Sequence, residues 1–225
     1  MSESSAVMSL VELLAVGEVT RAVEQARERL ARSPGDTEAL LALARVAVEA
    51  GQGPRASSLL QQAVTQGAAP RDVTLVRAAL AFQRGDWVAA RNLYLPLAAE
   101  EPPPTEALYG LGVALLRTGE VDAGREALEL AVRQDPELPS LRFELGRAYA
   151  MSDGLRPAVR QFVACLRLNV AEARAWRFLA ELLAERGRTR MAESLLSRGL
   201  EYAPDSGLLR EPLPGSTPAR RPERW

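Results

Sequence analysis

The sequence predicts an all-α solenoid built from about six helix-turn-helix repeats of 34 residues each. The prediction rests on three sets of positions, each with a spacing of 34 residues. The first set is Gly17, Gly51, Gly85, Gly119 and Gly187, with Asp153 and the adjacent Gly154 at the remaining place. The second set is Ala22, Ala56, Ala90, Gly124, Ala158 and Ala192. The third set is Pro34, Ala68, Pro102, Pro136, Val170 and Pro204. Three registers that agree on one period indicate a tandem repeat.

Each set of positions has a physical reason. Glycine at the end of a helix adopts the left-handed backbone conformation of a C-cap without strain from a Cβ atom. A small residue five positions later lets the returning helix approach its partner closely. Proline further on ends the second helix, because it has no N–H group and disfavours a helical residue before it. One repeat is therefore expected to be a helix, a tight turn, a second helix and a connecting turn.

Apolar residues recur at helical intervals in the same register. In residues 105–138 they are Leu108, Leu111, Leu115 and Leu116 on the first helix, followed by Leu128 and Ala131 on the second. The next repeat has Leu145, Gly146, Tyr149, Ala158, Phe162 and Cys165, and the one after it has Trp176, Leu179, Ala180, Leu183, Ala192 and Leu196. This combination of large, small, aromatic, glycine and proline positions resembles the tetratricopeptide repeat.

The resemblance extends over roughly residues 3–204 and implies a right-handed α-α superhelical solenoid over residues 1–204. The expected repeats are 3–36, 37–70, 71–104, 105–138, 139–172 and 173–206. The first repeat is atypical, with Ala6 in place of a large apolar residue and Arg29 in place of a small one. Terminal repeats in such arrays are often atypical caps.

The third repeat also departs from the pattern. Thr74 and Arg77 stand at core positions, so the first helix is expected either to be rotated or to bury Leu75 and Val76 instead. Pro96 is expected to bend its helix or end it early.

Residues 211–225 are rich in proline and charge and are predicted to be disordered. The apolar side of the last helix then lacks a following helix to bury it. Leu208, Leu209 and Leu213 can fold back over it, or another chain can, which allows self-association through this end.

Composition excludes several chemistries. All 28 basic residues are arginine, and the chain has neither lysine nor histidine. An imidazole base, a histidine metal ligand, a Schiff-base lysine and a phosphate-loop lysine are therefore impossible. Cys165 is the one cysteine, so an internal disulfide and a cysteine zinc cluster are excluded as well, and a buried structural thiol is expected. We expect a non-enzyme without cofactor or metal.

Charge and hydropathy indicate a cytoplasmic protein. The 28 basic residues nearly balance 29 acidic ones, so no net field recruits nucleic acid or an anionic membrane. The first residues lack a basic segment, Glu12 interrupts their apolar stretch, and no apolar run approaches the roughly 20 residues of a membrane span. The use of arginine alone is typical of a GC-rich bacterial genome.

The tryptophans and the glycine pair of the chain can each have a structural or a functional role. Trp176 is expected in the core, and Trp87 is expected to pack between neighbouring repeats. Trp225, in the tail, is either an anchor for a partner or without a role. Gly110 and Gly112 lie within a helical pattern and follow no strand, which excludes a dinucleotide-binding loop.

Charged clusters are read as solvated surface. Arg177, Glu181 and Glu185 have the i, i+4 spacing of an ion-paired, solvated helix face, which is favoured over a polar site. Arg220, Arg221 and Arg224 are favoured as a solvated tail over a phosphate-binding element.

By the resemblance, the first helices line a concave groove that binds peptides or helices. The positions expected to face the groove are Leu41, Arg45, Leu75, Phe82, Tyr109, Val113, Leu116, Phe143, Arg147, Arg177 and Glu181. This set predicts an apolar stripe with arginines at its ends. The lysine and asparagine clamp by which some family members grip chaperone C-termini is absent: the matching residues are Leu41 with Arg45, Tyr109 with Val113, and Phe143 with Arg147.

The function expected from these features is that of a non-catalytic scaffold or adaptor. Its groove would bind an apolar or amphipathic peptide or helix of a protein partner, with a carboxylate near an arginine. The alternative is a structural subunit of a larger bacterial assembly, such as a secretion or pilus machine, that uses the ends of the solenoid. The apolar stripe favours the first hypothesis, and the sparse C-terminal cap favours the second.

Overall fold

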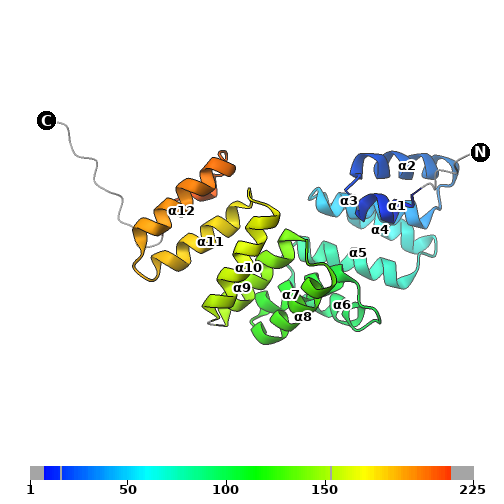
Figure 1. Ribbon diagram of the computed structural model, residues 1–225. Coiled ribbons are helices and arrows are strands. Elements are labelled where there is room, and N and C mark those ends of the chain that lie inside the picture. The colour runs from blue at the N-terminus through cyan, green and yellow to red at the C-terminus, as the bar shows by residue number, and fades with distance from the viewer. Residues whose placement is uncertain (1–7, 16, 153, 214–225) are drawn as a thin grey trace, which may run out of the picture. The chain divides into compact units, whose positions relative to one another are not determined.

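The computed structural model describes residues 8–15, 17–152 and 154–213, and over these ranges it contains thirteen helices and no strand (Figure 1). The all-α class predicted from the sequence is confirmed. The helices are α1 (Leu10–Ala15), α2 (Val19–Arg32), α3 (Thr37–Glu49), α4 (Gly53–Thr65), α5 (Pro70–Gln83), α6 (Trp87–Ala98), α7 (Thr105–Thr118), α8 (Val121–Gln134), α9 (Pro139–Met151), α10 (Leu155–Leu168), α11 (Ala173–Ala184), α12 (Thr189–Tyr202) and α13 (Gly207–Arg210). None of the helices in the described ranges is long and apolar enough to cross a membrane.

The 34-residue period appears directly in the helix bounds. The second helices of successive pairs begin at residues 19, 53, 87, 121, 155 and 189, each 34 residues after the one before. The predicted left-handed glycines are confirmed: Gly17, Gly51, Gly85, Gly119 and Gly187 have φ angles between 69° and 90°. Asp153, the expected substitute in the fifth pair, lies outside the described residues, whereas Gly154 is the N-cap of α10 with φ −82°.

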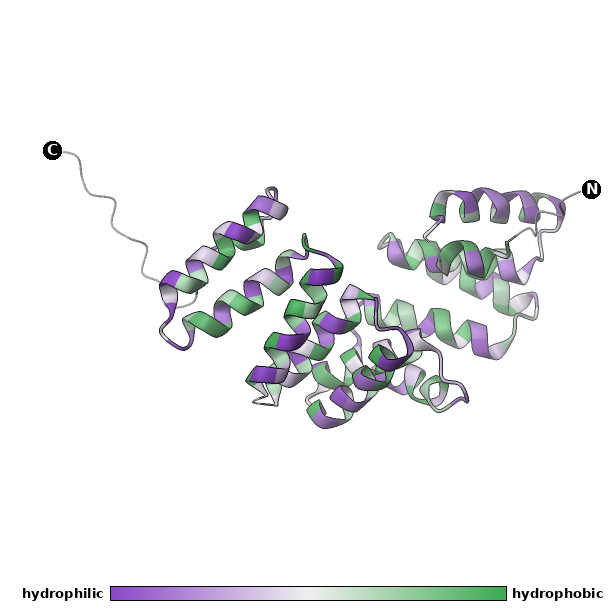
Figure 2. Cartoon of the chain, viewed as in Figure 1, coloured by the Kyte–Doolittle hydropathy of each residue, from purple (hydrophilic) through white to green (hydrophobic). Residues whose placement is uncertain are grey.

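The chain divides into two compact units, Met1–Glu120 and Val121–Trp225. In the first unit, α1 packs on α3, α3 on α5 and α5 on α7, so the first helices of successive pairs form a continuous layer. Within this unit, each second helix packs against the first helix of its own pair and of the next one, as α4 does against α3 and α5. We call the surface formed by the first helices the inner face. Figure 2 shows apolar and polar residues on different sides of the helices.

The irregular third repeat buries the apolar residues that stand beside its two unusual core positions. Leu75 and Val76 are buried, with 8% and 2% of their surface exposed, while Arg77 is exposed. Pro96 lies inside α6, which ends two residues later at Ala98 and has 12 residues, against 14 in α8. The early end follows from the hydrogen bond that a proline cannot donate.

Trp87 packs as expected between neighbouring repeats. Its ring meets the Phe82 ring edge-on at 5.3 Å between centroids, and the Arg117 guanidinium of the following pair lies over it at 5.2 Å. Both contacts join α6 to adjacent first helices.

The second unit has an aromatic core. Phe143 and Phe162 are almost fully buried and contact the Phe178 ring at 5.5 Å between centroids. Cys165 belongs to the same cluster, and burial raises the pKa of its thiol to about 11. The predicted structural thiol is therefore confirmed. Trp176 is also buried, and its indole N–H donates to the Val170 carbonyl at 2.7 Å.

The flank of the last helix pair is covered by the chain itself. The short helix α13 and the residues after it fold against α11 and α12, so that Leu209 and Leu213 are buried at 2% and 5% exposure in a cluster with Trp176 and Leu196. This is the fold-back arrangement that the sequence left open. Glu211–Leu213 are thus ordered against α11, and the rest of the predicted disordered tail lies outside the described residues.

Arg177 holds this cap in place, which corrects its reading as part of a solvated face. Its side chain is buried, and it donates to the carbonyls of Leu208 at 3.3 Å, Glu211 at 2.7 Å and Pro212 at 3.0 Å. Pro212 has no N–H group with which to satisfy the Leu208 carbonyl, so the guanidinium supplies the missing donor. The expected pair with Glu181 exists at 2.6 Å and neutralises the buried charge.

Removal of this guanidinium is expected to loosen the cap. Arg177→Met leaves carbonyl groups without donors and Glu181 without its partner, so we expect a loss of about 3 kcal/mol in the free energy of unfolding. Arg198→Met, on the exposed side of α12, is the matched control and should change it by less than about 0.5 kcal/mol. Urea denaturation measures both, and equal losses would show that Arg177 does not hold the cap.

The glycine turns give a second prediction. Gly119→Val forces a β-branched residue to φ 90°, and we expect it to lower the free energy of unfolding by on the order of 1 to 3 kcal/mol. Gly154→Ala keeps an ordinary φ and comes no closer than 3.1 Å to its nearest neighbour, the Tyr149 carbonyl oxygen, so its loss should be smaller. Gly207→Ala, which meets nothing within 4 Å, is the neutral control. Similar urea midpoints for Gly119→Val and Gly207→Ala would contradict the role of the left-handed turn.

Candidate partner-binding site

The inner face of the first unit contains a hollow of about 250 Å³. It lies among α1, α3 and the start of α5, three elements that the order of packing brings together. Its walls consist of Val11, Leu14, Thr37, Glu38, Leu41, Ala42, Arg45, Ala69, Arg71, Asp72, Leu75 and Val76. One wall is formed by Val11 and Leu14 of α1, a helix of six residues.

The floor of the hollow is apolar. Leu41 and Leu75 come from α3 and α5, and each keeps 8% of its surface exposed. Val76 beside them is buried, whereas Val11 on the opposite wall is 58% exposed. An open apolar concavity of this kind gains free energy when a partner's apolar side chain displaces its water.

The charged residues at the rim already have partners within the chain. Arg45 pairs with Glu106 at 2.7 Å, and Arg71 pairs with Glu100 at 2.9 Å and with Asp72 at 3.5 Å. A charged ligand group would therefore have to compete with an internal ion pair, while an apolar side chain would disturb none.

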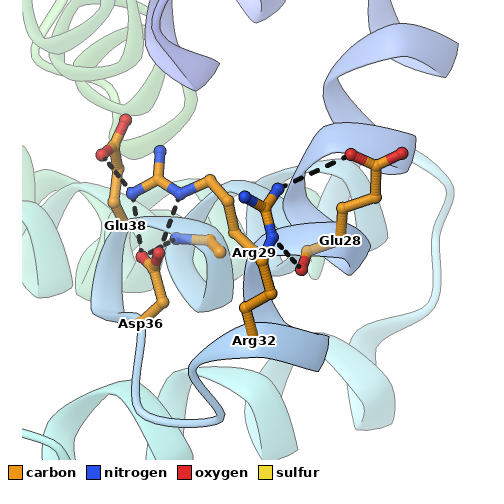
Figure 3. A network of polar contacts seen from close by, with 6 residues as sticks. Glu28, Arg29, Arg32, Asp36 and Glu38 are labelled. Atoms are coloured by element: carbon orange, nitrogen blue, oxygen red, sulfur yellow. Dashed lines mark hydrogen bonds and ion pairs between the residues drawn. The ribbon is translucent and has the colours of Figure 1, made fainter.

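The Glu38 carboxylate belongs to a network that ties α2 to the start of α3 (Figure 3). Arg29 donates to Glu38 at 2.8 Å and to Asp36 at 2.8 and 3.1 Å, and Asp36 accepts from the Ala39 amide as the N-cap of α3. Burial acts to raise the pKa of Asp36, but hydrogen bonds from Arg29 and Ala39 outweigh it and lower that pKa. The network explains why arginine replaces a small residue at position 29.

The pair between Arg45 and Glu106 joins helices that are two pairs apart. Arg45 is on α3 and Glu106 on α7, and α5 packs between these helices. Arg45 also lines the hollow, so the ion pair lies at its rim. Burial raises the pKa of the Tyr94 phenol, and the charge of Glu106 adds to that rise while Arg45 opposes it.

Gly110 makes room for the Tyr94 ring. A Cβ atom at Gly110 would overlap with that ring, so the glycine permits the close approach of α6 and α7. This explains a glycine inside a helix, where it otherwise lowers stability.

We expect Gly110→Ala to lower the free energy of unfolding by about 2 kcal/mol, since the Tyr94 ring has to move in a packed core. Adding Tyr94→Leu should restore part of the loss. Thermal or urea unfolding of the single and double variants forms the measurement, and purely additive losses would argue against the contact.

The structure brings only some of the predicted groove residues together. Leu41, Arg45 and Leu75 line the hollow. Phe82 and Tyr109 are half-buried neighbours with ring centroids 6.0 Å apart.

The expectation of an exposed apolar stripe is wrong for five of its members. Leu41 and Leu75 are each 8% exposed, Val113 and Leu116 are each 3% exposed, and Phe143 is 2% exposed within the aromatic core. The first helices are covered on more than one side, so a residue that points away from its own pair is still buried. Arg147 is paired with Glu144 at 2.6 Å, and Arg177 binds the C-terminal cap.

Several residues of the hollow were not identified from the sequence. Val11 and Leu14 belong to the atypical first repeat, where the pattern is weakest, and Glu106 reaches Arg45 from 61 positions away. No short-range sequence pattern predicts such a pairing.

Comparisons with known proteins identify the family. Two tetratricopeptide-repeat family models match residues 13–80 and 75–139. The chain belongs to the tetratricopeptide-repeat family, and it has the fold of that family's helical arrays. A search of curated protein sequences found no match.

Solved structures with the same fold have low sequence identity to this chain. A chain of the APC/C hetero-tetramer Cut9–Hcn1 superposes with a TM-score of 0.75 at 16% identity, covering 89% of this chain but only 40% of that longer one. PilW, a type IV pilus biogenesis factor, has a TM-score of 0.71 at 16% identity, with 89% of this chain and 93% of PilW covered. YrrB, described as a tetratricopeptide-repeat protein with an unusual peptide-binding site, has a TM-score of 0.58 at 17% identity and coverages of 84% and 97%.

Proposed function

We propose that the chain is a non-catalytic scaffold that binds a partner polypeptide through the hollow on the inner face of its first unit. The observation that carries the proposal is an apolar floor, to which Leu41 and Leu75 contribute the 8% of their surface that is exposed, inside a rim of charges that are already paired. Proteins of this family serve as protein-interaction scaffolds.

The size of the hollow indicates what it accepts. Clefts that hold whole small molecules measure about 300–1,000 Å³, and this one measures about 250 Å³. It therefore suits side chains of a peptide or helix, one large or two smaller, rather than a complete small-molecule ligand. A few such buried anchors supply most of the affinity in many protein complexes.

The polar contribution differs from what the sequence suggested. A ligand carboxylate would reach Arg45 only by displacing Glu106, which lies 2.7 Å from it. We propose that the apolar anchor dominates binding and that Arg45 contributes by keeping the rim neutral. Most of the free energy then comes from water released at the floor.

The test places charge in the hollow without altering the core. Val11 and Ala69 both line the hollow and are exposed, so Val11→Glu with Ala69→Glu should preserve folding. The double variant should bind the partner at least about tenfold more weakly, because two carboxylates would have to be desolvated. Partners captured by the purified full chain are identified by mass spectrometry, and binding is then measured with the purified partner by calorimetry.

Val88→Glu is the matched control, since Val88 is 54% exposed on α6 of the same unit and does not line the hollow. Its affinity for the partner should equal that of the unaltered chain. Unchanged affinity in the Val11 and Ala69 variant, with an unchanged melting temperature, would exclude the hollow as the binding site.

A second candidate is a subunit of a larger bacterial assembly in the cytoplasm, of the secretion or pilus type. It is favoured by the similarity to PilW over 93% of that pilus biogenesis factor. The covered C-terminal flank removes the reason for stacking through that end, because Leu209 and Leu213 already occupy it. Such a subunit would then contact its neighbours in the assembly through the exposed faces of its helices.

A further inference from the structure

The exposed side of α10 carries arginines that have no carboxylate partner in the described part of the chain. Arg156, Arg160 and Arg167 are exposed, and α10 itself contains neither aspartate nor glutamate. Other arginines of the unit do pair closely with carboxylates, as Arg125 does with Asp122 at 3.0 Å and Arg147 with Glu144 at 2.6 Å. What distinguishes α10 is that three exposed arginines share one helix that has no acidic residue of its own.

These arginines lie on one face of the helix. Positions 156, 160, 163 and 167 follow the i, i+4, i+7 and i+11 spacing of a single helical stripe. Val163, between the arginines, is 37% exposed, and Leu168 at the end is 42% exposed. The opposite face is buried through Ala158, Phe162 and Cys165. We call the residues Arg156, Arg160, Val163, Arg167 and Leu168 the α10 ridge.

The arrangement is unfavourable for the isolated chain. Like charges at i and i+4, as in Arg156 and Arg160, destabilise a helix by about as much as an ion pair stabilises it. A partner that brings negative charge removes this repulsion. The basic character continues in the next pair, where Arg190 is exposed on α12 exactly one repeat, 34 residues, after Arg156.

We propose that the α10 ridge is a second interaction surface, which binds an acidic amphipathic helix of a protein partner. By the rise of an α-helix, Arg156 and Arg160 lie about 6 Å apart along the axis and Arg160 and Arg167 about 10.5 Å. Glutamates with the same spacing on a parallel helix meet all three guanidinium groups, each of which can bind a carboxylate through two parallel hydrogen bonds. An apolar residue between the glutamates meets Val163.

Other anionic partners fit the ridge less well. The ridge has no aromatic side chain on which nucleic-acid bases could stack. Its two apolar residues, Val163 and Leu168, offer little to insert into a membrane interface, where larger apolar faces with tryptophan or phenylalanine are usual. The proposal concerns a second helix of its pair, so it stands independently of the hollow on the inner face.

The experiment uses the full chain and a designed probe. The probe is a fluorescein-labelled helical peptide with glutamates at i, i+4 and i+11 and leucine at i+7, and a scrambled peptide of identical composition is its control. Fluorescence anisotropy should show the designed peptide binding at least about tenfold more tightly than the scrambled one. Equal affinities would overturn the proposal, because they would mean attraction by charge alone.

Charge-reversed variants locate the binding. R156E/R160E/R167E should lose at least about tenfold in affinity for the designed peptide, and R156Q/R160Q/R167Q is the second variant in case charge reversal unfolds the helix. R21E/R27E/R133E makes the same change in net charge at exposed positions on α2 and α8 and should leave the affinity unchanged. Equal loss in this control overturns the proposal, as does binding of phosphatidylserine vesicles or a single-stranded oligonucleotide through the ridge without binding of the peptide.

Discussion

Burial of each first helix among its neighbours is the constraint on which the rest of the structure depends. Eight of the 13 residues of α3 are buried, among them Leu40, Ala44 and Val48. That helix contacts α1, α2, α4 and α5, so its sides are covered by parts of three different pairs. A single helix pair could not bury so much apolar surface, and the array is therefore stable only as a stack. The tight turns at residues such as Gly51 and Gly85 follow from this, since each second helix has to return close to the first.

The same constraint explains how the array ends. A stack leaves one apolar flank at its last pair, and here a truncated first helix closes it. The segment is too short to satisfy its own carbonyl groups, because α13 has four residues and Pro212 cannot donate a hydrogen bond. A buried arginine replaces the missing donors, and its charge is balanced by Glu181 at 2.6 Å. The cap thus combines apolar burial through Leu209 with a polar contact that fixes where the chain leaves α11.

Sequence reasoning succeeded where a property depends on position within the repeat. The left-handed glycines and the structural role of Cys165 both follow from one 34-residue register. It failed where a property depends on which neighbours cover a residue. Phe143 occupies a register position like that of Tyr109, yet it is 2% exposed because Phe162 and Phe178 enclose it.

The candidate site shows the same division. Leu41 and Leu75 could be placed on the inner face from the register, but another wall of the hollow comes from Val11 and Leu14 of α1, in the repeat that matches the pattern least. The ion pair of Arg45 and Glu106 joins positions 61 residues apart, and no local pattern encodes it. Such long-range pairings arise from the packing of successive pairs, and they set the polarity of the rim.

The two proposed surfaces differ in how their charges are balanced. At the hollow, the arginines face carboxylates of their own unit, so electrostatic free energy is already gained before any partner arrives. On the α10 ridge the arginines are exposed and face each other along one helix, so that free energy remains to be gained on binding. An apolar partner is thus selected by shape and dehydration, and an acidic one by charge. A repeat array can carry both kinds of surface because substitutions on the outer side of one second helix leave the buried positions of its neighbours unchanged.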